Sequence, residues 1–246
     1  MNESARRSAA AVERLDETTR RLRRECPWDR EQDERSIVPH TVEEAYELAD
    51  AAERRDDARM LDELGDVLFQ VHFLALLLEE RGAGDLAAVA EGCREKLIRR
   101  HPHVFGDAEA ESAGQVLRNW DRIKQEQEGR GGAREPFADV PENLPALLYA
   151  RKLQRRAGSA GRIEEGDPAD AARALRKSAD DLAGLLEQGE SGAPTANPAE
   201  RQRVHAALGE MLFAAVEVAR RLSADPELAL RATADRFREL KDSSAS

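Results

Sequence analysis

Hydrophobic positions recur at helical spacing along most of this chain. Between residues 5 and 25 they fall on one side of a predicted helix, at Val12, Leu15 and Leu22. Between Met60 and Arg81 they lie nearly all round the helix, which is typical of a central buried element or a subunit interface. Further helices are predicted from Thr41 to about residue 54, from Asp85 to Arg100 and from Val116 to Glu128. The pattern therefore predicts an all-α protein.

Two consecutive helices of this pattern carry pairs of carboxylates. Glu44 and Glu47 lie on the first helix, and Glu63 and Asp66 lie on the second. Residues three apart share a helix face, so each pair points in one direction. The polar joint at residues 54–57 is short enough to make the two helices antiparallel neighbours. The two pairs are therefore expected to face each other.

Helix geometry and charge repulsion together indicate what lies between these pairs. A rise of about 1.5 Å per residue places the first pair about 10 to 15 Å above the joint and the second about 8 to 12 Å above it. Two carboxylates about 5 Å apart repel by roughly 3 kcal/mol at an effective dielectric constant near 20. Four of them would open the hairpin unless a cation lay among them. Carboxylate oxygens suit Mg²⁺ or Mn²⁺, so a divalent metal site is predicted.

Part of this pattern also has a purely structural explanation. Thr41 with Glu44 fits a capping box at the predicted start of the first helix. It accounts for neither Glu47 nor the pair on the second helix, so the metal site is the favoured interpretation. Gly65 lies within the second pair and lowers helix stability by roughly 1 kcal/mol relative to alanine. Close approach of another backbone or a ligand would offset that cost.

The segment Cys26-Pro27-Trp28-Asp29 follows the first helix and predicts a break, because proline cannot continue the hydrogen-bond ladder. Trp28 is therefore expected in a loop. It could cover the core as a lid, or it could present a flat surface to a nucleobase.

A basic cluster ends the helix predicted at residues 85–100. It contains Lys96, Arg99 and Arg100. Cations at a helix C-terminus interact favourably with the helix dipole, which is a structural explanation. The functional alternative is that Lys96, with Arg99 or Arg100, receives phosphate oxygens.

The second half of the chain repeats part of the first. Residues 64–69 return at 208–213 with an offset of 144, and the preceding helix returns near residues 177–182. By this alignment Glu44, Glu47, Glu63 and Asp66 fall on Ser178, Asp181, Ala207 and Glu210. Because two of the four carboxylates are lost, the second half is expected to keep the scaffold with a weak or absent metal site.

Composition limits the partners and the setting of the protein. The 246 residues suffice for one large domain or two of about 120. A net charge of −11 argues against nucleic acid or an anionic membrane as partner.

Cys26 and Cys93 give no disulfide framework. The first 25 residues lack the apolar core of a signal peptide, and Val67–Leu78 is too short to span a bilayer. A soluble, cytoplasmic protein is expected.

Several stretches, in order along the chain, resemble the MazG family of nucleoside triphosphate pyrophosphohydrolases. The acidic signature is Glu43-Glu44-x-x-Glu47 followed by Glu63-x-x-Asp66. Four other matching stretches are Cys26-Pro27-Trp28-Asp29-x-x-Gln32, Lys96-Leu97-x-Arg99-Arg100-His101-Pro102-His103-Val104-Phe105, Asn119-Trp120-x-x-Ile123-Lys124 and Leu144-Pro145-Ala146-Leu147. The likeness covers roughly residues 20 to 240 and is closest to the two-domain members.

This resemblance implies tandem four-helix-type bundle domains, usually dimeric. Residues 1–130 would form a domain with an intact metal site, residues 131–140 a linker, and residues 141–246 a degenerate second domain. The implied reaction is Mg²⁺-dependent hydrolysis of a nucleoside triphosphate to the monophosphate and pyrophosphate, as nucleotide-pool house-cleaning. The four carboxylates Glu44, Glu47, Glu63 and Asp66 would ligate the metal.

Roles for further residues follow from cleavage between the α and β phosphates. Glu43 is a candidate general base, although a solvated surface glutamate explains it equally well. Trp28 would face the base, and the pyrophosphate end would be held by Lys96, Arg99, Arg100 and Lys124, from this chain or its dimer mate.

Two rival functions belong to other classes. A di-iron oxidase needs Glu-x-x-His pairs, and neither Glu44 nor Glu63 is followed by histidine at that spacing. A non-catalytic helical nucleotide sensor would bind a triphosphate without turning it over.

Overall fold

The computed structural model describes residues 2–110, 114–116, 119–120, 122–123, 137–138, 140–163, 166–188 and 197–243. Every regular element in these ranges is a helix, which confirms the predicted all-α class. The chain divides into two compact units, residues 1–110 and 111–246. The helix predicted at 116–128 and the linker predicted at 131–140 fall mostly outside the described residues.

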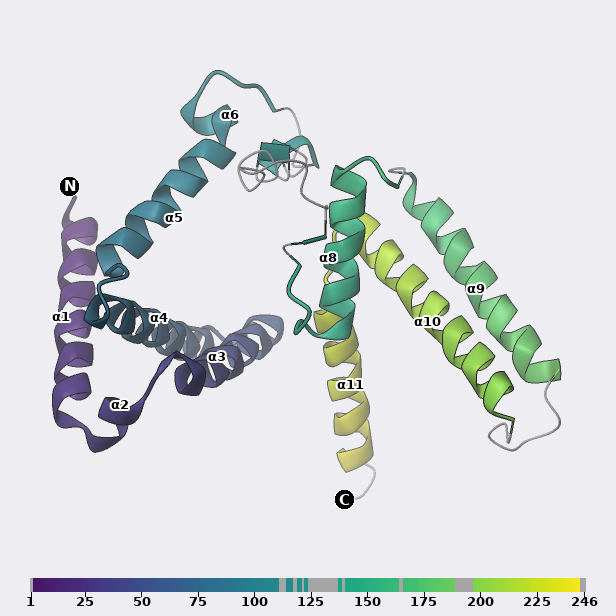
Figure 1. Ribbon diagram of the computed structural model, residues 1–246, viewed down its shortest axis with the longest axis horizontal. Helices are drawn as coiled ribbons and strands as arrows, with labels where there is room; N and C mark the ends of the chain where they lie inside the picture. Colours follow the sequence, from purple (N-terminus) through teal and green to yellow (C-terminus); the bar gives the residue numbers. More distant parts are fainter. Residues whose placement is uncertain are drawn as a thin grey trace. The chain divides into compact units, whose positions relative to one another are not determined.

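The first unit contains three long helices and several shorter ones, and two of the long helices form a hairpin (Figure 1). Its elements are α1 (Glu3–Glu25), α2 (Pro27–Glu31), α3 (Glu34–Arg54), α4 (Asp57–Glu80), α5 (Leu86–Arg100) and α6 (Pro102–Phe105).

The end of α1 and the turn that follows it differ in one respect from the sequence-based expectation. Proline does end α1, as predicted, and Cys26 donates its backbone N–H to the carbonyl of Leu22. The chain then enters the five-residue helix α2 at once, because Pro27 stands at a first-turn position, where no backbone N–H is needed. The expectation that Trp28 lies in a loop was wrong: it lies within α2.

The start of α3 was also predicted wrongly. The helix begins at Glu34, seven residues before Thr41, so the capping box of Thr41 with Glu44 does not exist. Asp33 is the N-cap and forms a capping box with Ser36 instead. Pro39 is accommodated inside the helix at the cost of one backbone hydrogen bond. The structural explanation for Glu44 is thereby removed.

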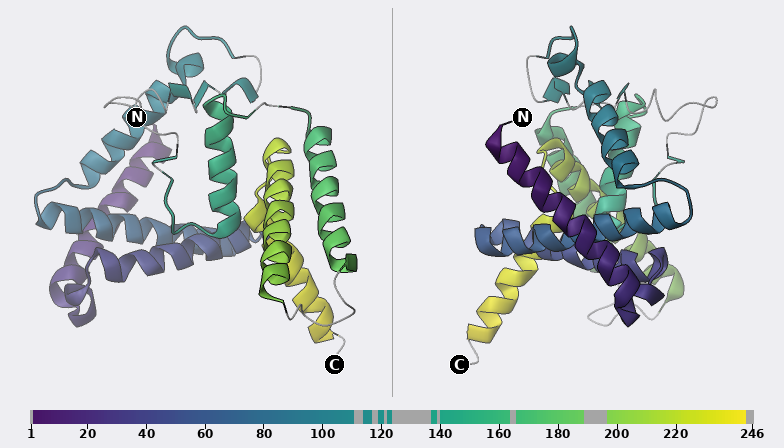
Figure 2. Two further views of the ribbon diagram at one scale, coloured as in Figure 1. Left: turned by 45° about the vertical axis from the view of Figure 1, so that its right-hand side comes forward. Right: turned by 90° about the vertical axis from the view of Figure 1, so that its left-hand side faces the viewer.

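The joint between α3 and α4 forms the tight connection that its sequence predicts. Arg55 adopts a left-handed conformation with φ of 56°, and Asp56 caps α4 by accepting a hydrogen bond from the N–H of Arg59. The carboxylate of Asp50 then ties the two helices together, because it accepts hydrogen bonds from Arg54 at 2.9 Å and from Arg59 at 2.8 Å. The two helices lie side by side in both orientations of Figure 2, as antiparallel neighbours.

The core of the first unit forms around the C-terminal half of α4. Phe73 and Leu77 are buried there against Ile37 of α3, with Phe69 and Leu74 packed around them. The completely buried Phe73 is the largest side chain in this cluster. The prediction that α4 is a central helix is correct for this half.

The N-terminal half of α4 presents a different surface. Leu61, Leu64, Leu68 and Val71 are exposed and recur at intervals of three and four residues, so they form one stripe along the helix. We call these four residues the α4 stripe. A helix that buries one face and leaves an apolar stripe on another offers a second packing surface.

The second unit is built round another pair of helices. Its elements are α8 (Ala146–Ser159), α9 (Pro168–Gln188), α10 (Pro198–Arg221) and α11 (Pro226–Ser243). α9 and α10 pack together along their length, and α8 contacts α10 and α11. The buried side chain of Gln154 fixes α8 to α10, since it donates a hydrogen bond to the carbonyl of Phe213 at 2.8 Å. The repeat found in the sequence therefore coincides with a repeated helix pair.

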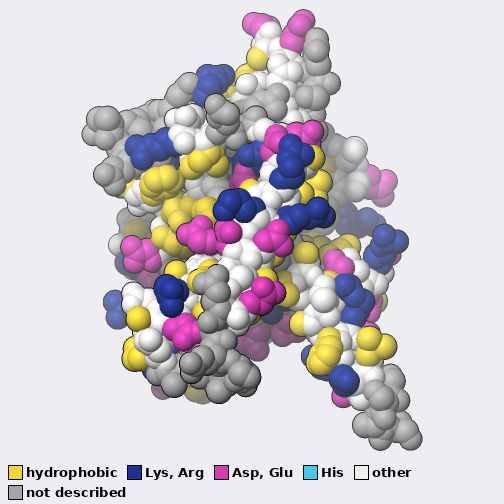
Figure 3. Space-filling view, turned by 90° about the vertical axis from the view of Figure 1, so that its right-hand side faces the viewer, with side chains coloured by type: hydrophobic (Ala, Val, Ile, Leu, Met, Phe, Trp, Pro, Cys, Tyr) yellow, Lys and Arg dark blue, Asp and Glu magenta, His cyan; other side chains and the backbone are white. Residues whose placement is uncertain are grey.

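Among the described residues, no helix combines the length and the apolar character needed to cross a bilayer. On the face drawn in Figure 3, hydrophobic side chains alternate with acidic and basic ones, and neither sign of charge gathers over it.

Candidate metal centre

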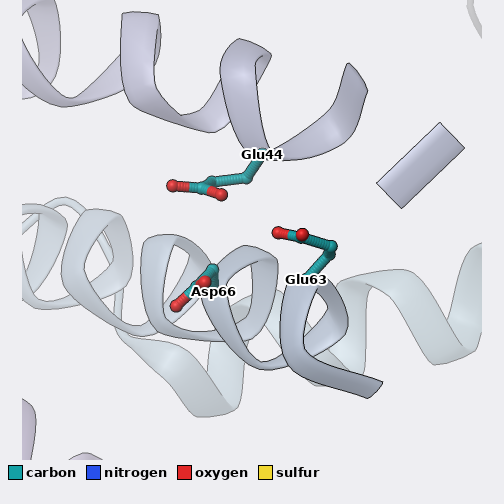
Figure 4. A group of neighbouring side chains, drawn as sticks. All are labelled: Glu44, Glu63 and Asp66. Atoms are coloured by element: carbon teal, nitrogen blue, oxygen red, sulfur yellow. The ribbon is translucent and has the colours of Figure 1, made fainter. Parts of the chain in front are cut away.

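Three carboxylates meet across the gap between α3 and α4. Glu44 projects from α3 towards Glu63 and Asp66, which lie one turn apart on α4 (Figure 4). Each contributes an oxygen, and these three oxygens all lie within 4.8 Å of one another. They come together because spacing by three puts Glu63 and Asp66 on one face and the short joint folds α3 back over that face.

Glu47 is the exception among the four predicted carboxylates. It is exposed and does not belong to the group of three oxygens. Its negative charge nevertheless acts on the cluster, since it raises the pKa of both Glu44 and Glu63. Glu47 therefore lies at the edge of the site, close enough for its charge to affect Glu44 and Glu63.

Burial and mutual repulsion make the cluster a poor place for uncompensated negative charge. Glu63 is only 8% exposed. Desolvation is the main cause that raises the pKa of Glu63, and the charge of Glu47 adds to it. Desolvation likewise raises the pKa of Glu44, followed by the charges of Asp66, Glu47 and Glu63. Such carboxylates lose their protons less readily than exposed ones, and a cation bound among them would favour their charged form.

The donor set fits a hard divalent ion. Mg²⁺ binds oxygens at about 2.1 Å, so ligands on opposite sides of the ion lie about 4.2 Å apart. Three oxygens within 4.8 Å of one another are close enough for a single ion to contact all three after side-chain adjustment. Within the described part of the chain this is the one group of acidic, histidine or cysteine side chains arranged in this way, and it contains no histidine.

Arg59 is a neighbour of the cluster that the sequence analysis did not single out. Arg59 lies one turn before Glu63 on α4, and its Nη2 is 3.8 Å from Oε1 of Glu63. Its Nη1 donates a hydrogen bond to the carboxylate of Asp50. This positive charge lowers the pKa of Glu63 and so opposes part of the desolvation. The signal was present in the sequence, because Arg59 and Glu63 are four residues apart.

Glu43, the candidate general base, lies beside the cluster rather than in it. Its side chain is exposed, and one carboxylate oxygen is 3.8 Å from Nδ1 of His40. Among the charges that raise the pKa of Glu44, that of Glu43 has the smallest effect.

Trp28 lies near the same stretch of α3. Its ring meets that of His40 edge to face, with the centroids 5.9 Å apart, and the side chain remains 51% exposed. His40 is one turn before Glu44 on the same side of α3. The His40 ring and one turn of α3 therefore separate the indole from Glu44, a relation that the sequence alone did not reveal.

The residues predicted to bind phosphate do not lie beside the carboxylates of the same chain. Lys96, Arg99 and Arg100 lie on the last turns of α5, which leaves the C-terminal end of α4 and ends well away from the α3–α4 hairpin (Figure 1). Arg99 contacts its own helix neighbour Glu95 at 3.5 Å. Lys124 lies outside the described residues.

In the corresponding helix pair of the second unit, the described residues form no such group. Ser178 and Ala207 replace two of the carboxylates, and no metal-binding group is found among the described residues of α9 and α10. Glu210 is exposed.

Comparison with known proteins identifies the family. The model of the MazG nucleotide pyrophosphohydrolase domain matches residues 32–105. A nucleoside triphosphate pyrophosphohydrolase of Escherichia coli (strain K12) is 34% identical over 212 residues, which cover 86% of this chain and 77% of that protein. The chain belongs to the MazG family.

Further MazG-family relatives extend the likeness. The nucleoside triphosphate pyrophosphohydrolase/pyrophosphatase MazG of Thermotoga maritima is 37% identical over 214 residues, covering 87% of this chain and 76% of its own. A nucleoside triphosphate pyrophosphohydrolase of Mycolicibacterium smegmatis is 34% identical over 151 residues, covering 61% and 46% respectively. The matched MazG domain contains the three clustered carboxylates and the basic cluster on α5, and it lies wholly within the first unit.

Proposed function

We propose that this MazG-family protein hydrolyses nucleoside triphosphates to the monophosphate and pyrophosphate, and that the reaction takes place in its first unit. The observation that supports this most directly is the convergence of Glu44, Glu63 and Asp66 from two helices into one group of oxygens. The names of the relatives supply the substrate class, and nucleotide-pool house-cleaning in the cytoplasm is the corresponding role.

In this proposal Glu44, Glu63 and Asp66 hold Mg²⁺, or Mn²⁺ in its place, and Glu47 completes the set from the edge. Bound there, the ion would neutralise charge on phosphate oxygens and lower the pKa of a water molecule. The burial of Glu63 excludes water from one side of the site, which strengthens every interaction with charge inside it. Arg59 favours the charged form of Glu63 and orients its carboxylate from the side of the joint.

Glu43 is the proposed acceptor of the proton from the attacking water. Its neighbour His40, 3.8 Å away, would orient the carboxylate and stabilise its charge when protonated. Lys96, Arg99, Arg100 and Lys124 are the proposed partners of the pyrophosphate end. Since the first three lie away from the carboxylates of their own chain, a second copy is the more natural source of these cations.

A homodimer is part of the same proposal. The α4 stripe, Leu61, Leu64, Leu68 and Val71, lies on a different face of α4 from Glu63 and Asp66 and is exposed in the single chain. Pairing two such stripes would remove apolar surface from water.

Product analysis with Mg²⁺ and a panel of normal and modified triphosphates tests the function. The wild-type protein should release pyrophosphate rather than orthophosphate. Glu63→Gln and Asp66→Asn should each reduce the rate by more than about a hundredfold, beyond the roughly 10- to 100-fold loss typical of residues that only orient a ligand. Helix content measured by circular dichroism should not change.

Glu210→Gln is the matched control, because Glu210 stands where Asp66 stands in the repeat. It should leave the rate nearly unchanged, and a hundredfold loss would move the reaction to the second unit. Wild-type turnover in Glu63→Gln would contradict the proposed metal site. Stabilisation by a triphosphate with Mg²⁺ but without any product would instead indicate a nucleotide sensor.

A further inference from the structure

One guanidinium group, that of Arg23, joins three helices of the first unit. Its Nε and Nη2 donate hydrogen bonds to the two carboxylate oxygens of Glu80 on α4, each at 2.8 Å. Its Nη1 donates to the backbone carbonyls of Asp29 at 2.6 Å and Gln32 at 3.0 Å. All three nitrogens are engaged at once, and the planar fork that allows this has no counterpart in lysine.

The two carbonyls identify what Arg23 controls. Asp29 belongs to α2 and Gln32 caps its end, so Nη1 satisfies carbonyls at the C-terminus of a helix only five residues long. So short a helix has little stability of its own and depends on such contacts. The guanidinium also packs over the ring of the buried Phe73, with Cζ 5.7 Å from the ring centroid.

The side chain that α2 presents is Trp28. Its own carbonyl is held by the side-chain amide of Gln32 at 2.9 Å, and its ring rests edge-on against His40. Four residues separate His40 from Glu44, a rise of about 6 Å along α3. A nucleobase stacked on the exposed indole would thus leave its phosphates within reach of the carboxylates.

Arg23 itself is remote from those carboxylates. Its partner Glu80 is fourteen residues beyond Asp66 on α4, about 21 Å at the helical rise. Arg23 therefore does not act on the carboxylates directly, and its contacts with Asp29 and Gln32 are the ones that lead towards Trp28.

We propose that Arg23 is a positioning residue for nucleotide binding, because it locks α2 onto α4 and so holds Trp28 as the surface on which the base stacks. This inference rests on the function proposed above. It predicts that loss of the lock weakens substrate binding and leaves the hydrolytic step unaffected.

The test compares Arg23→Lys with Arg20→Lys in the full-length protein. Arg20 forms the same kind of two-pronged contact between α1 and α4, with Glu79 at 2.6 and 3.0 Å, and its third hydrogen bond goes to Asp16 of α1 rather than to α2. Both variants weaken the clamp between α1 and α4, so both should lose similar thermal stability. Only Arg23→Lys should raise KM, by about tenfold, at the low end of what loss of a base–aromatic stack costs. Its kcat should stay within about twofold of wild type.

A double-mutant cycle separates positioning from general loosening. Trp28→Ala alone should raise KM to a similar extent, and Arg23→Lys added to it should cause no further rise. Additive effects, or equal increases in KM for Arg20→Lys and Arg23→Lys, would overturn the proposal. Should Arg23→Lys fail to fold, Glu80→Gln serves in its place: it releases Arg23 from α4, and an unchanged KM would overturn the proposal.

A second measurement does not depend on hydrolysis. In a Trp120→Phe background Trp28 is the sole tryptophan, so its fluorescence reports on α2 alone. Arg23→Lys should make Trp28 more accessible to acrylamide quenching, and Arg20→Lys should not. If the wild-type protein hydrolyses no triphosphate, the proposed function fails while this readout still decides whether Arg23 holds α2; unchanged quenching in Arg23→Lys would refute the lock.

Discussion

At the scale of single residues, charge is the feature that governs this protein. Glu44 and Glu63 are placed where burial and neighbouring carboxylates raise their pKa, with Arg59 as partial compensation. Folded chains accept such a cost at sites where a ligand relieves it. The stability of the first unit should therefore depend on pH and on metal in a linked way.

The sign of this pH dependence follows from the raised pKa of Glu63. Above the ordinary glutamate value of 4.5 the unfolded chain has lost the proton while the folded chain still holds it, so stability is lost as pH rises through the folded-state pKa. Glu63→Gln removes this titration. In metal-free buffer, the melting temperature of Glu63→Gln minus that of wild type should increase as pH rises from about 4.5 towards neutrality.

Metal should reverse the trend in the wild-type protein, because the ion competes with protons for the same oxygens. Stabilisation by Mg²⁺ in differential scanning fluorimetry should grow with pH and be absent in Glu63→Gln. If the rise in melting temperature caused by Mg²⁺ differed between the two proteins by the same amount at every pH, metal and protons would not compete for the same oxygens.

At the scale of elements, the repeated hairpin lets one half of the protein serve as the control for the other. Gly65 on α4 and Gly209 on α10 are equivalent positions, and a Cβ added to either meets no atom within 4 Å. No close contact inside the described chain therefore requires glycine at either place. Only Gly65 is flanked by clustered carboxylates.

Alanine at these two positions should separate helix stability from function. Gly65→Ala and Gly209→Ala should each stabilise the protein by roughly 1 kcal/mol, which raises the melting temperature by about 2–4 °C for a protein of this size. If a substrate approaches the backbone at Gly65, only Gly65→Ala should lower turnover. Equal activity of both variants would show that no ligand approaches the backbone at Gly65.

At the scale of the whole molecule, the apolar surface left on α4 is the dominant unexplained feature of the single chain. The α4 stripe continues on the helix whose other half forms the core, so one element supplies both packing surfaces. Isolated exposed leucines need no explanation, but a stripe at helical spacing does.

Charge placed in the stripe should break the proposed dimer. The double variant Leu64→Lys, Leu68→Lys should halve the mass measured by light scattering, because two lysines cannot be buried against their own copies. Val89→Lys, at an exposed apolar position of α5 outside the stripe, is the control and should keep the wild-type mass. A wild-type protein that is already monomeric would refute the dimer.

The sequence by itself determined the helical class, the α3–α4 hairpin, the repeat in α9 and α10, and the meeting of Glu44 with Glu63 and Asp66. These follow from local rules, since helical period and a short joint fix which side chains share a face. α3 begins at Glu34 rather than near Thr41 because Asp33 and Ser36 form a local capping box, a signal that the sequence interpretation missed. Only the tertiary structure decided that Glu47 stands apart and that Arg23 binds α2. Each of those outcomes depends on contacts between groups whose positions are set by packing, and no spacing along the chain encodes them.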